Sequence, residues 1–178
     1  GEQLENYTKY KLKSSDELSS VLSGKDNLFV IACNKCFKEF ETVDEPDCDE
    51  FLKFAAAEGK TVTGSAKVDF LCNKMHTERK LQDLIPEGTE NVVVISCGLG
   101  IQTVADLAGK PVVAASNTLN YRGHHGMALT KKSCDACAQC YLNITGGVCP
   151  IVDCSKSLVN GQCGGAKNGK CEVDPNKD

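Results

Sequence analysis

Apolar residues gather in short runs along the first two thirds of the chain. Residues 28–32 form a continuous apolar run, and residues 91–96 and 111–115 repeat the pattern. A further strand is expected within residues 61–71. Continuous runs of this length are typical of strands in a parallel sheet, because helices cover both of its faces.

Helical periodicity separates these runs. Ser14 and Glu17 form a capping-box sequence ahead of a short amphipathic helix. Further helices are expected between residues 47 and 59, between residues 73 and 86, and over residues 101–108. Strands that alternate with helices predict an α/β fold with right-handed crossovers. We therefore expect a flavodoxin- or Rossmann-like parallel sheet of about four strands with flanking helices.

Composition divides the chain into four parts. Residues 1–27 are expected to form an N-terminal arm and the short helix, and residues 28–116 the α/β domain. Residues 117–133, rich in Asn, Gly and His, are expected to be a linker, followed by a cysteine-rich tail over residues 134–178. The tail has few large apolar side chains, so we expect a metal to hold it, since metal-binding free energy then becomes folding free energy. The arm is expected to lie along the edge of the sheet or on a partner protein.

Charge and cysteine content narrow the class of protein. The 178 residues carry a net charge of −4, which argues against a general nucleic-acid binder. No apolar run is long enough to cross a membrane and no signal peptide is visible, so we expect a cytoplasmic protein. Twelve cysteines indicate either a secreted disulfide framework or metal and redox chemistry inside the cell. The ordinary α/β core favours the second class.

Four cysteines stand at, or one turn beyond, the carboxyl ends of expected strands: Cys33, Cys36, Cys72 and Cys97. Ligands of open α/β sheets bind at this edge, and helix N-termini there favour an anionic group. The four thiolates therefore predict a first [4Fe–4S] cluster. Burial as small apolar residues, or a thioredoxin-like redox pair at Cys33 and Cys36, are the alternatives. Cys48 is expected to be a free or packed thiol.

The sequence Gly98-Leu-Gly100 resembles part of a dinucleotide-binding fingerprint. Thr103 stands where the third glycine or alanine belongs, and Asn117 and Asn120 stand where an acidic residue would bind the ribose. We therefore expect no nicotinamide site, and the chain carries no flavin fingerprint.

The tail contains seven cysteines: Cys134, Cys137, Cys140, Cys149, Cys154, Cys163 and Cys171. The Cys-x2-Cys-x2-Cys spacing of the first three resembles the ferredoxin run and predicts a second [4Fe–4S] cluster. One of the four later cysteines is expected to be its fourth ligand, and the others to hold zinc or a further cluster. His124 and His125 are expected to be exposed, with zinc ligation as the alternative.

Residues 134–172 resemble the methylenetetrahydrofolate reductase C-terminal domain family. The resemblance rests mainly on Cys134-x2-Cys-x2-Cys140-Tyr-Leu, Thr145-Gly-Gly-Val-Cys-Pro150 and Asn160-Gly-Gln-Cys-Gly-Gly165. Upstream, Cys33-x-x-Cys36 and Ser96-Cys-Gly-Leu-Gly100 resemble it less specifically, and the acidic loop over residues 37–47 departs from it. The cysteines on the strand ends are also similar to those in the small subunit of nickel–iron hydrogenases.

The resemblance implies a cysteine-rich small subunit that accompanies a flavin-containing catalytic subunit in acetogenic and other anaerobic bacteria. Such a subunit would pass electrons to or from the flavin in Wood–Ljungdahl one-carbon metabolism, with ferredoxin or another electron-donor subunit as a further partner. The resemblance implies that the reduction itself takes place on a TIM barrel of the partner. A TIM barrel needs about 250 residues, more than this chain has, so we expect a non-catalytic subunit of an oxidoreductase. A zinc-stabilised docking subunit without a redox role is the alternative function, and a thioredoxin-like dithiol oxidoreductase is the third.

Overall fold

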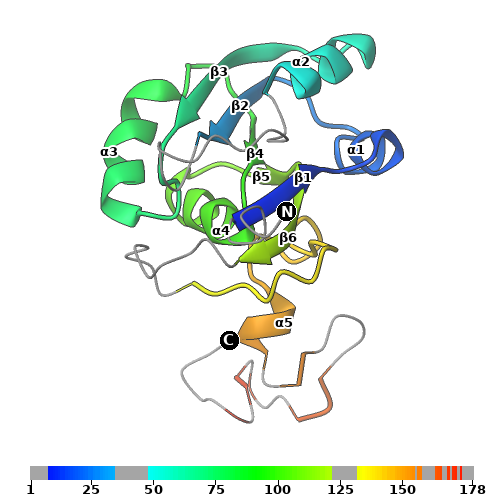
Figure 1. The fold of residues 1–178 in the computed structure, drawn as a ribbon, viewed down its shortest axis with the longest axis vertical. Coiled ribbons are helices and arrows are strands. Elements are labelled where there is room, and N and C mark those ends of the chain that lie inside the picture. Colours follow the sequence, from blue (N-terminus) through cyan, green and yellow to red (C-terminus); the bar gives the residue numbers. More distant parts are fainter. Residues whose placement is uncertain are drawn as a thin grey trace, which may run out of the picture.

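A four-stranded parallel sheet forms the centre of the protein, shown in Figure 1 as a computed structural model. Its strands are β2 Leu28–Cys33, β3 Val62–Val68, β4 Asn91–Ile95 and β5 Val112–Ala114. The order across the sheet is β3-β2-β4-β5, so that the second strand along the chain lies outside the first, as in flavodoxin-like sheets. This arrangement confirms the predicted α/β class.

The structure describes only part of the chain: residues 8–34, 48–121, 132–154, 156–157, 163–165, 168, 170–171 and 173. Helices cover both faces of the sheet (Figure 1). They are α1 Ser15–Val21, α2 Cys48–Ala57, α3 Lys74–Leu84 and α4 Gly98–Leu107. Helices α1 and α2 pack on one face and α3 and α4 on the other.

The two faces of β2 contribute to two separate apolar cores. Val30 and Ala32 lie in the core beneath α1 and α2, whereas Phe29 and Ile31 lie in the core beneath α3 and α4. Successive side chains of a strand point to opposite faces, so a strand covered on both sides must be apolar throughout. This is why the continuous apolar run predicted the strand correctly.

The capping box expected at Ser14 is present, and Asn73 is a second side-chain N-cap. The Ser14 hydroxyl accepts a hydrogen bond from the Glu17 amide at 3.3 Å, and the Glu17 carboxylate accepts one from the Ser14 amide at 2.9 Å. Asn73 begins α3 in a similar way, because its side-chain oxygen accepts from the His76 amide at 3.1 Å. These caps satisfy amides that have no partner within the helix.

A two-stranded antiparallel ribbon lies beside the main sheet and corrects two predictions. Its strands are β1 Thr8–Leu12 and β6 Ser116–Tyr121. The expected linker over residues 117–133 therefore begins with a strand. The end of the expected arm, in turn, pairs with the chain's own β6 rather than with an edge of the main sheet. Polar strands of this kind lack the apolar run by which strands were recognised.

The cysteine-rich tail contacts the α/β domain directly. Leu142 is 4% exposed and packs in the core beneath α3 and α4. The Asn143 side chain accepts from the Ala114 amide at 2.6 Å and donates to the Ala114 carbonyl at 2.9 Å, as a neighbouring strand would. A short helix, α5 Pro150–Asp153, follows. The expected division of domains at residue 134 is thus crossed by apolar and polar contacts.

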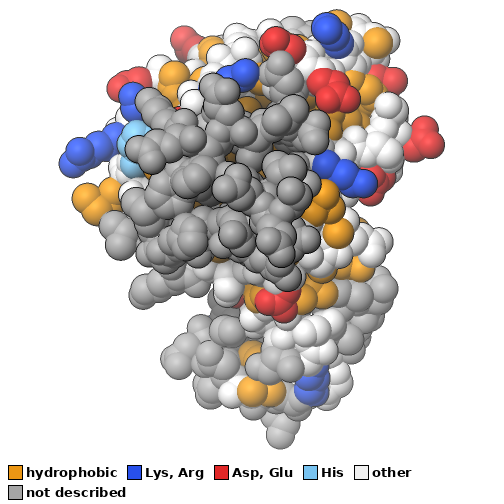
Figure 2. Space-filling model, in the orientation of Figure 1, with side chains coloured by type: hydrophobic (Ala, Val, Ile, Leu, Met, Phe, Trp, Pro, Cys, Tyr) orange, Lys and Arg blue, Asp and Glu red, His pale blue; other side chains and the backbone are white. Residues whose placement is uncertain are grey.

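Lysine and arginine side chains are interspersed with aspartate and glutamate on the face shown in Figure 2. On the described part of that face they form no continuous basic patch. The expected absence of nucleic-acid binding remains a prediction. Among the described residues, no helix combines the length and the apolar character that crossing a membrane requires.

Candidate metal centre

Three members of the first cysteine set, Cys33, Cys72 and Cys97, lie at the carboxyl edge of the sheet. Cys33 ends β2, Cys97 precedes α4, and Cys72 follows β3 in the turn before α3. Cys72 and Cys97 are buried together with Leu99 in one small apolar cluster, against which Tyr10 packs. The Tyr10 hydroxyl donates to the Cys33 carbonyl at 2.8 Å, so strand β1 contacts the described cysteines of this set. The strand order reverses between β2 and β4, which is where open α/β sheets bind their ligands.

Cys36 lies outside the described residues. Neither the four-thiolate set nor the Cys33–Cys36 redox pair is therefore tested by the structure, and both remain predictions. Cys48 is 3% exposed and belongs to the core beneath α1 and α2, as expected of a packed thiol. No disulfide joins two of the described cysteines.

Four cysteines of the tail line one narrow cavity: Cys134, Cys137, Cys140 and Cys149. The cavity has a volume of about 20 Å³, which is room for a single water-sized occupant. Sequence spacing left the fourth ligand of this set open among four later cysteines. Cys149 lines the cavity together with the first three cysteines. The structure also describes Cys154, Cys163 and Cys171, and these do not line it.

The four thiols share this cavity without forming a closed ligand shell. Among the described residues, no three Cys, His, Asp or Glu side chains converge closely enough to hold a metal ion. The backbone nonetheless places the four cysteines around one cavity, and a thiol side chain can turn about one bond while the backbone stays fixed. The donor set therefore fits a thiolate-bound metal, and ligation requires the sulfur atoms to turn inward.

Gly98 allows Cys134 to approach the start of α4. A Cβ atom on Gly98 would lie 2.7 Å from the Cys134 Sγ, closer than real Cβ atoms come to other atoms. A Cβ on Gly100 would meet Ser96 and Leu71 in the same way. The two glycines that resemble a dinucleotide fingerprint are thus explained by close packing around the first turn of α4 and by the approach of a cysteine.

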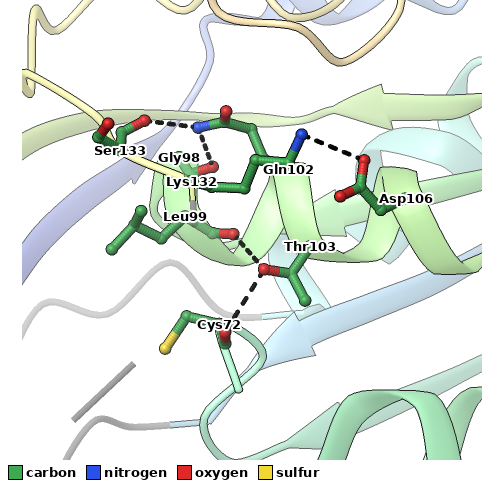
Figure 3. A network of polar contacts seen from close by, with 8 residues as sticks. All are labelled: Cys72, Gly98, Leu99, Gln102, Thr103, Asp106, Lys132 and Ser133. Atoms are coloured by element: carbon green, nitrogen blue, oxygen red, sulfur yellow. Dashed lines mark hydrogen bonds and ion pairs between the residues drawn. The ribbon is translucent and has the colours of Figure 1, made fainter. Parts of the chain in front are cut away.

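Gln102 holds the segment that leads into Cys134 (Figure 3). Its side-chain nitrogen donates to the Gly98 carbonyl at 3.0 Å and to the Ser133 carbonyl at 2.8 Å. Next to it, the Lys132 ammonium lies 3.3 Å from the Asp106 carboxylate. Helix α4 therefore fixes the residues immediately before the first cysteine of the tail.

Thr103 faces the other cysteine set (Figure 3). Its hydroxyl donates to the Leu99 carbonyl at 2.8 Å and lies 3.5 Å from the Cys72 carbonyl. Sequence reasoning used this threonine only to exclude a dinucleotide site. In the structure it joins α4 to the turn that carries Cys72.

Two hydroxyl side chains of β6 connect the sheet edge to the cysteine loop. The Ser116 hydroxyl accepts from the Ser96 amide at 2.9 Å and donates to the Ser96 carbonyl at 2.6 Å. The Thr118 hydroxyl accepts from the Gly98 amide at 2.8 Å, and the Thr118 carbonyl accepts from the Ala138 amide at 2.9 Å. Thr118 was expected in a linker and Ser116 at the end of the α/β domain, and sequence reasoning missed the role of both. The one available signal was a polar Ser-Asn-Thr sequence directly after an apolar strand.

Asn117, between these two residues, binds the loop near its third cysteine. Its side-chain oxygen accepts from the Cys140 amide at 3.0 Å and from the Lys13 ammonium at 2.7 Å. Lys13, Asn117 and Cys140 come from three distant parts of the sequence. Their convergence could not be read from spacing.

The pKa of the Cys140 thiol depends on burial and on neighbouring groups. Burial raises the pKa of the Cys140 thiol above its usual value, and Cys134 and Cys137 raise it further. The Leu142 amide and the positive charge of Lys13 act in the opposite direction. A metal must displace the proton of this thiol, so we expect metal binding to weaken as the pH falls.

A family model matches the C-terminal part of the chain. A search of curated proteins and a search of solved structures each found no similar chain. The matching family model begins within β5, so it includes β6 as well as the seven cysteines of the tail. Residues 113–178 match the family described as methylene-tetrahydrofolate reductase C terminal.

Proposed function

We propose that this chain is an iron–sulfur electron-transfer subunit of a methylenetetrahydrofolate reductase complex. The observation that carries the proposal is that Cys134, Cys137, Cys140 and Cys149 line one cavity, and all four lie within the segment that matches the reductase family. A [4Fe–4S] cluster bound by such thiolates would supply one-electron chemistry. The chain itself would hold this group against the sheet and limit its contact with water.

The adjacency of the two cysteine sets supports electron transfer. Cys97 of the first set is bonded to Gly98, and Gly98 is in contact with Cys134 of the second set. Consecutive Cα atoms are about 3.8 Å apart, so the two sets are neighbours across one residue. Two redox groups held this close can exchange electrons, as a relay between a donor and an acceptor requires.

The proposed acceptor or donor is the flavin of a catalytic reductase subunit, with ferredoxin or another electron-donor subunit as a further partner. The turn after Cys140 offers a contact surface, because Ile144 is 81% exposed and Val148 is 52% exposed. Large apolar side chains exposed together are typical of protein-binding surfaces. Co-purification of a flavoprotein with the wild-type chain, reduced by an Ile144→Asp change, would support this placement.

Metal analysis of anaerobically purified protein tests the proposal. We expect iron and sulfide, and we expect Cys97→Ala and Cys134→Ala each to lose about four irons per chain. Cys48→Ala is the matched control, since Cys48 is buried in the core away from both sets, and it should lose none. Iron content that is unchanged in both site variants would contradict the assignment of ligands.

Zinc is the second candidate, because four cysteines line one cavity. Four thiolates are also a common ligand set for structural zinc. Colourless protein with zinc and no sulfide would replace the electron-transfer proposal with that of a zinc-stabilised docking subunit.

A further inference from the structure

Lys13 is a buried cation at the junction of β1, β6 and the cysteine loop. Lys13 is only 7% exposed, and its backbone amide donates to the Ala115 carbonyl at 2.9 Å. The ammonium donates to the Asn117 side-chain oxygen at 2.7 Å and lies 3.5 Å from the Cys140 carbonyl. The backbone and the side chain of Lys13 are thus both held in place.

The positive charge of Lys13 has no carboxylate partner among the described residues. Glu17 is the acidic side chain whose charge interacts with it, but the Glu17 carboxylate is exposed and accepts its hydrogen bonds from Ser14. An ammonium removed from water is unfavourable unless a negative group compensates it. Two neutral carbonyl oxygens satisfy its hydrogen bonds without neutralising its charge.

The cysteine loop supplies negative charge once its thiols become thiolates. Four thiolates around Zn²⁺ leave a net charge of about −2, and an iron–sulfur cluster gains one further negative charge on reduction. Lys13 is placed to act on this charge through Asn117, which binds the Cys140 amide, and through the Cys140 carbonyl. Cys137 is exposed on the solvent side of the same loop. Lys13 is buried, so its positive charge lies on the side of the loop that faces the protein interior.

We propose that Lys13 is the positioning and charge-compensating residue of the second cysteine set. It holds the backbone of Cys140 and stabilises the bound, negatively charged metal–thiolate group. This inference rests on the proposed function in one respect, namely that Cys134, Cys137, Cys140 and Cys149 bind a metal.

Titration of the reduced full-length chain with Co²⁺ tests the inference. We measure the part of the thiolate–Co²⁺ absorption that Cys134→Ala abolishes, which isolates the second set. Lys13→Met should weaken this binding by about 10–100-fold, the usual effect of losing a residue that supports metal ligands. Lys11→Met removes the same charge from an exposed position on β1, two residues before Lys13, and should leave the affinity unchanged.

Two further variants separate charge from hydrogen bonding. Lys13→Arg keeps the charge, whereas Lys13→Gln keeps a donor for Asn117 but loses the charge. Charge compensation predicts that arginine restores Co²⁺ affinity and that glutamine does not. The midpoint potential of the iron-loaded chain gives a second measurement, with dithionite supplying the electron through redox dyes. The potential should shift to more negative values in Lys13→Gln and remain unchanged in Lys11→Met.

The outcomes distinguish this inference from the proposed function. Equal Co²⁺ binding by wild type and Cys134→Ala would contradict metal binding by the second set, whatever Lys13 does. Loss of binding in Cys134→Ala together with wild-type affinity and potential in Lys13→Gln would overturn the role of Lys13 and leave the metal site standing. Rescue by glutamine rather than arginine would likewise overturn charge compensation. Thermal melts of each variant exclude unfolding, and the arginine and glutamine variants remain decisive if Lys13→Met does not fold.

Discussion

The main sheet and the segment over residues 132–153 are stabilised by different interactions. In the sheet, Val93, Val94 and Ile31 are fully buried, and each contributes through apolar area at about 25 cal/mol per Å². In the cysteine segment, Leu142 anchors the chain, and the side chains of Gln102 and Asn143 set the position of the backbone through hydrogen bonds. Apolar burial is non-directional, whereas hydrogen bonds require defined geometry.

This difference separates stability from precision. A parallel sheet with two apolar cores loses little of its geometry when one side chain is trimmed. A loop that places four cysteines around one cavity depends on a few directed contacts, each of which fixes one backbone position. Changes in the cysteine segment should therefore disturb metal binding more than they disturb the fold.

The largest expected effect belongs to Leu142, the apolar anchor of the cysteine segment. Leu142→Ala should reduce the free energy of unfolding of that segment by about 2–5 kcal/mol, because it removes buried area and leaves a cavity. Limited proteolysis of the full chain, compared with urea denaturation followed by circular dichroism, measures the two regions separately.

Ile144→Ala is the matched control, two residues away and 81% exposed. Its effect should stay within about 0.5 kcal/mol. If Leu142→Ala lowered the stability of the sheet and of the segment equally, the two regions would form one cooperative unit and the comparison would fail.

A smaller effect is expected at Gly98. Gly98→Ala places a methyl group against the Cys134 Sγ and should cost about 1–3 kcal/mol, as overpacking does, although alanine favours a helix. Displacement of Cys134 should also reduce Co²⁺ binding by the second set. Gly164→Ala has open space around its Cβ and should change neither quantity. Normal Co²⁺ affinity in Gly98→Ala would show that the position of Cys134 is not critical.

The smallest expected effect is confined to the α/β domain. Ser14→Ala removes the N-cap of α1 and should lower stability by about 1 kcal/mol in thermal or urea denaturation. Ser20→Ala, on the exposed face of the same helix, is the control. Metal binding should be unchanged in both, and weaker metal binding in Ser14→Ala would show that the helix end and the cysteine loop are coupled.

The same cap gives a pH dependence with a defined sign. The hydrogen bond from the Ser14 amide is the main reason that the pKa of Glu17 lies below its ordinary value of 4.5. A carboxyl group with a lowered pKa in the folded state contributes stability above its unfolded pKa and loses it as the pH falls through the folded value. The contribution is small because Glu17 is exposed. Glu17→Gln should flatten the stability curve slightly below pH 4.5.

The comparison also explains which features the sequence could predict. Apolar runs at residues 28–32 and 91–96 identified strands because burial on both faces leaves a local pattern. The caps at Ser14 and Asn73 were predictable because a cap involves residues three positions apart. The grouping of Cys72 with Cys97 followed from the parallel sheet, whose carboxyl ends meet at one edge.

Other features left no local pattern. Strand β6 is polar and pairs with a strand far away in the sequence, so that it was assigned to a linker. Lys13 was assigned to an arm, although its partners are 104 and 127 residues further along the chain. Cys149 lies beside the first three tail cysteines because Leu142 and Asn143 hold the intervening turn against the sheet. Contacts between distant residues determine these features, and spacing alone does not encode them.

The pairing of β1 with β6 imposes an order on biosynthesis. All four strands of the main sheet precede residue 116, so the sheet can form before β6 leaves the ribosome. Strand β1 must then wait for its partner, and closure of so long a loop is slow. Lys13 reaches Cys140 only after that ribbon has closed. If the second cysteine set binds a metal as proposed, its loading is therefore expected to follow closure of the ribbon, which brings Lys13 to Cys140.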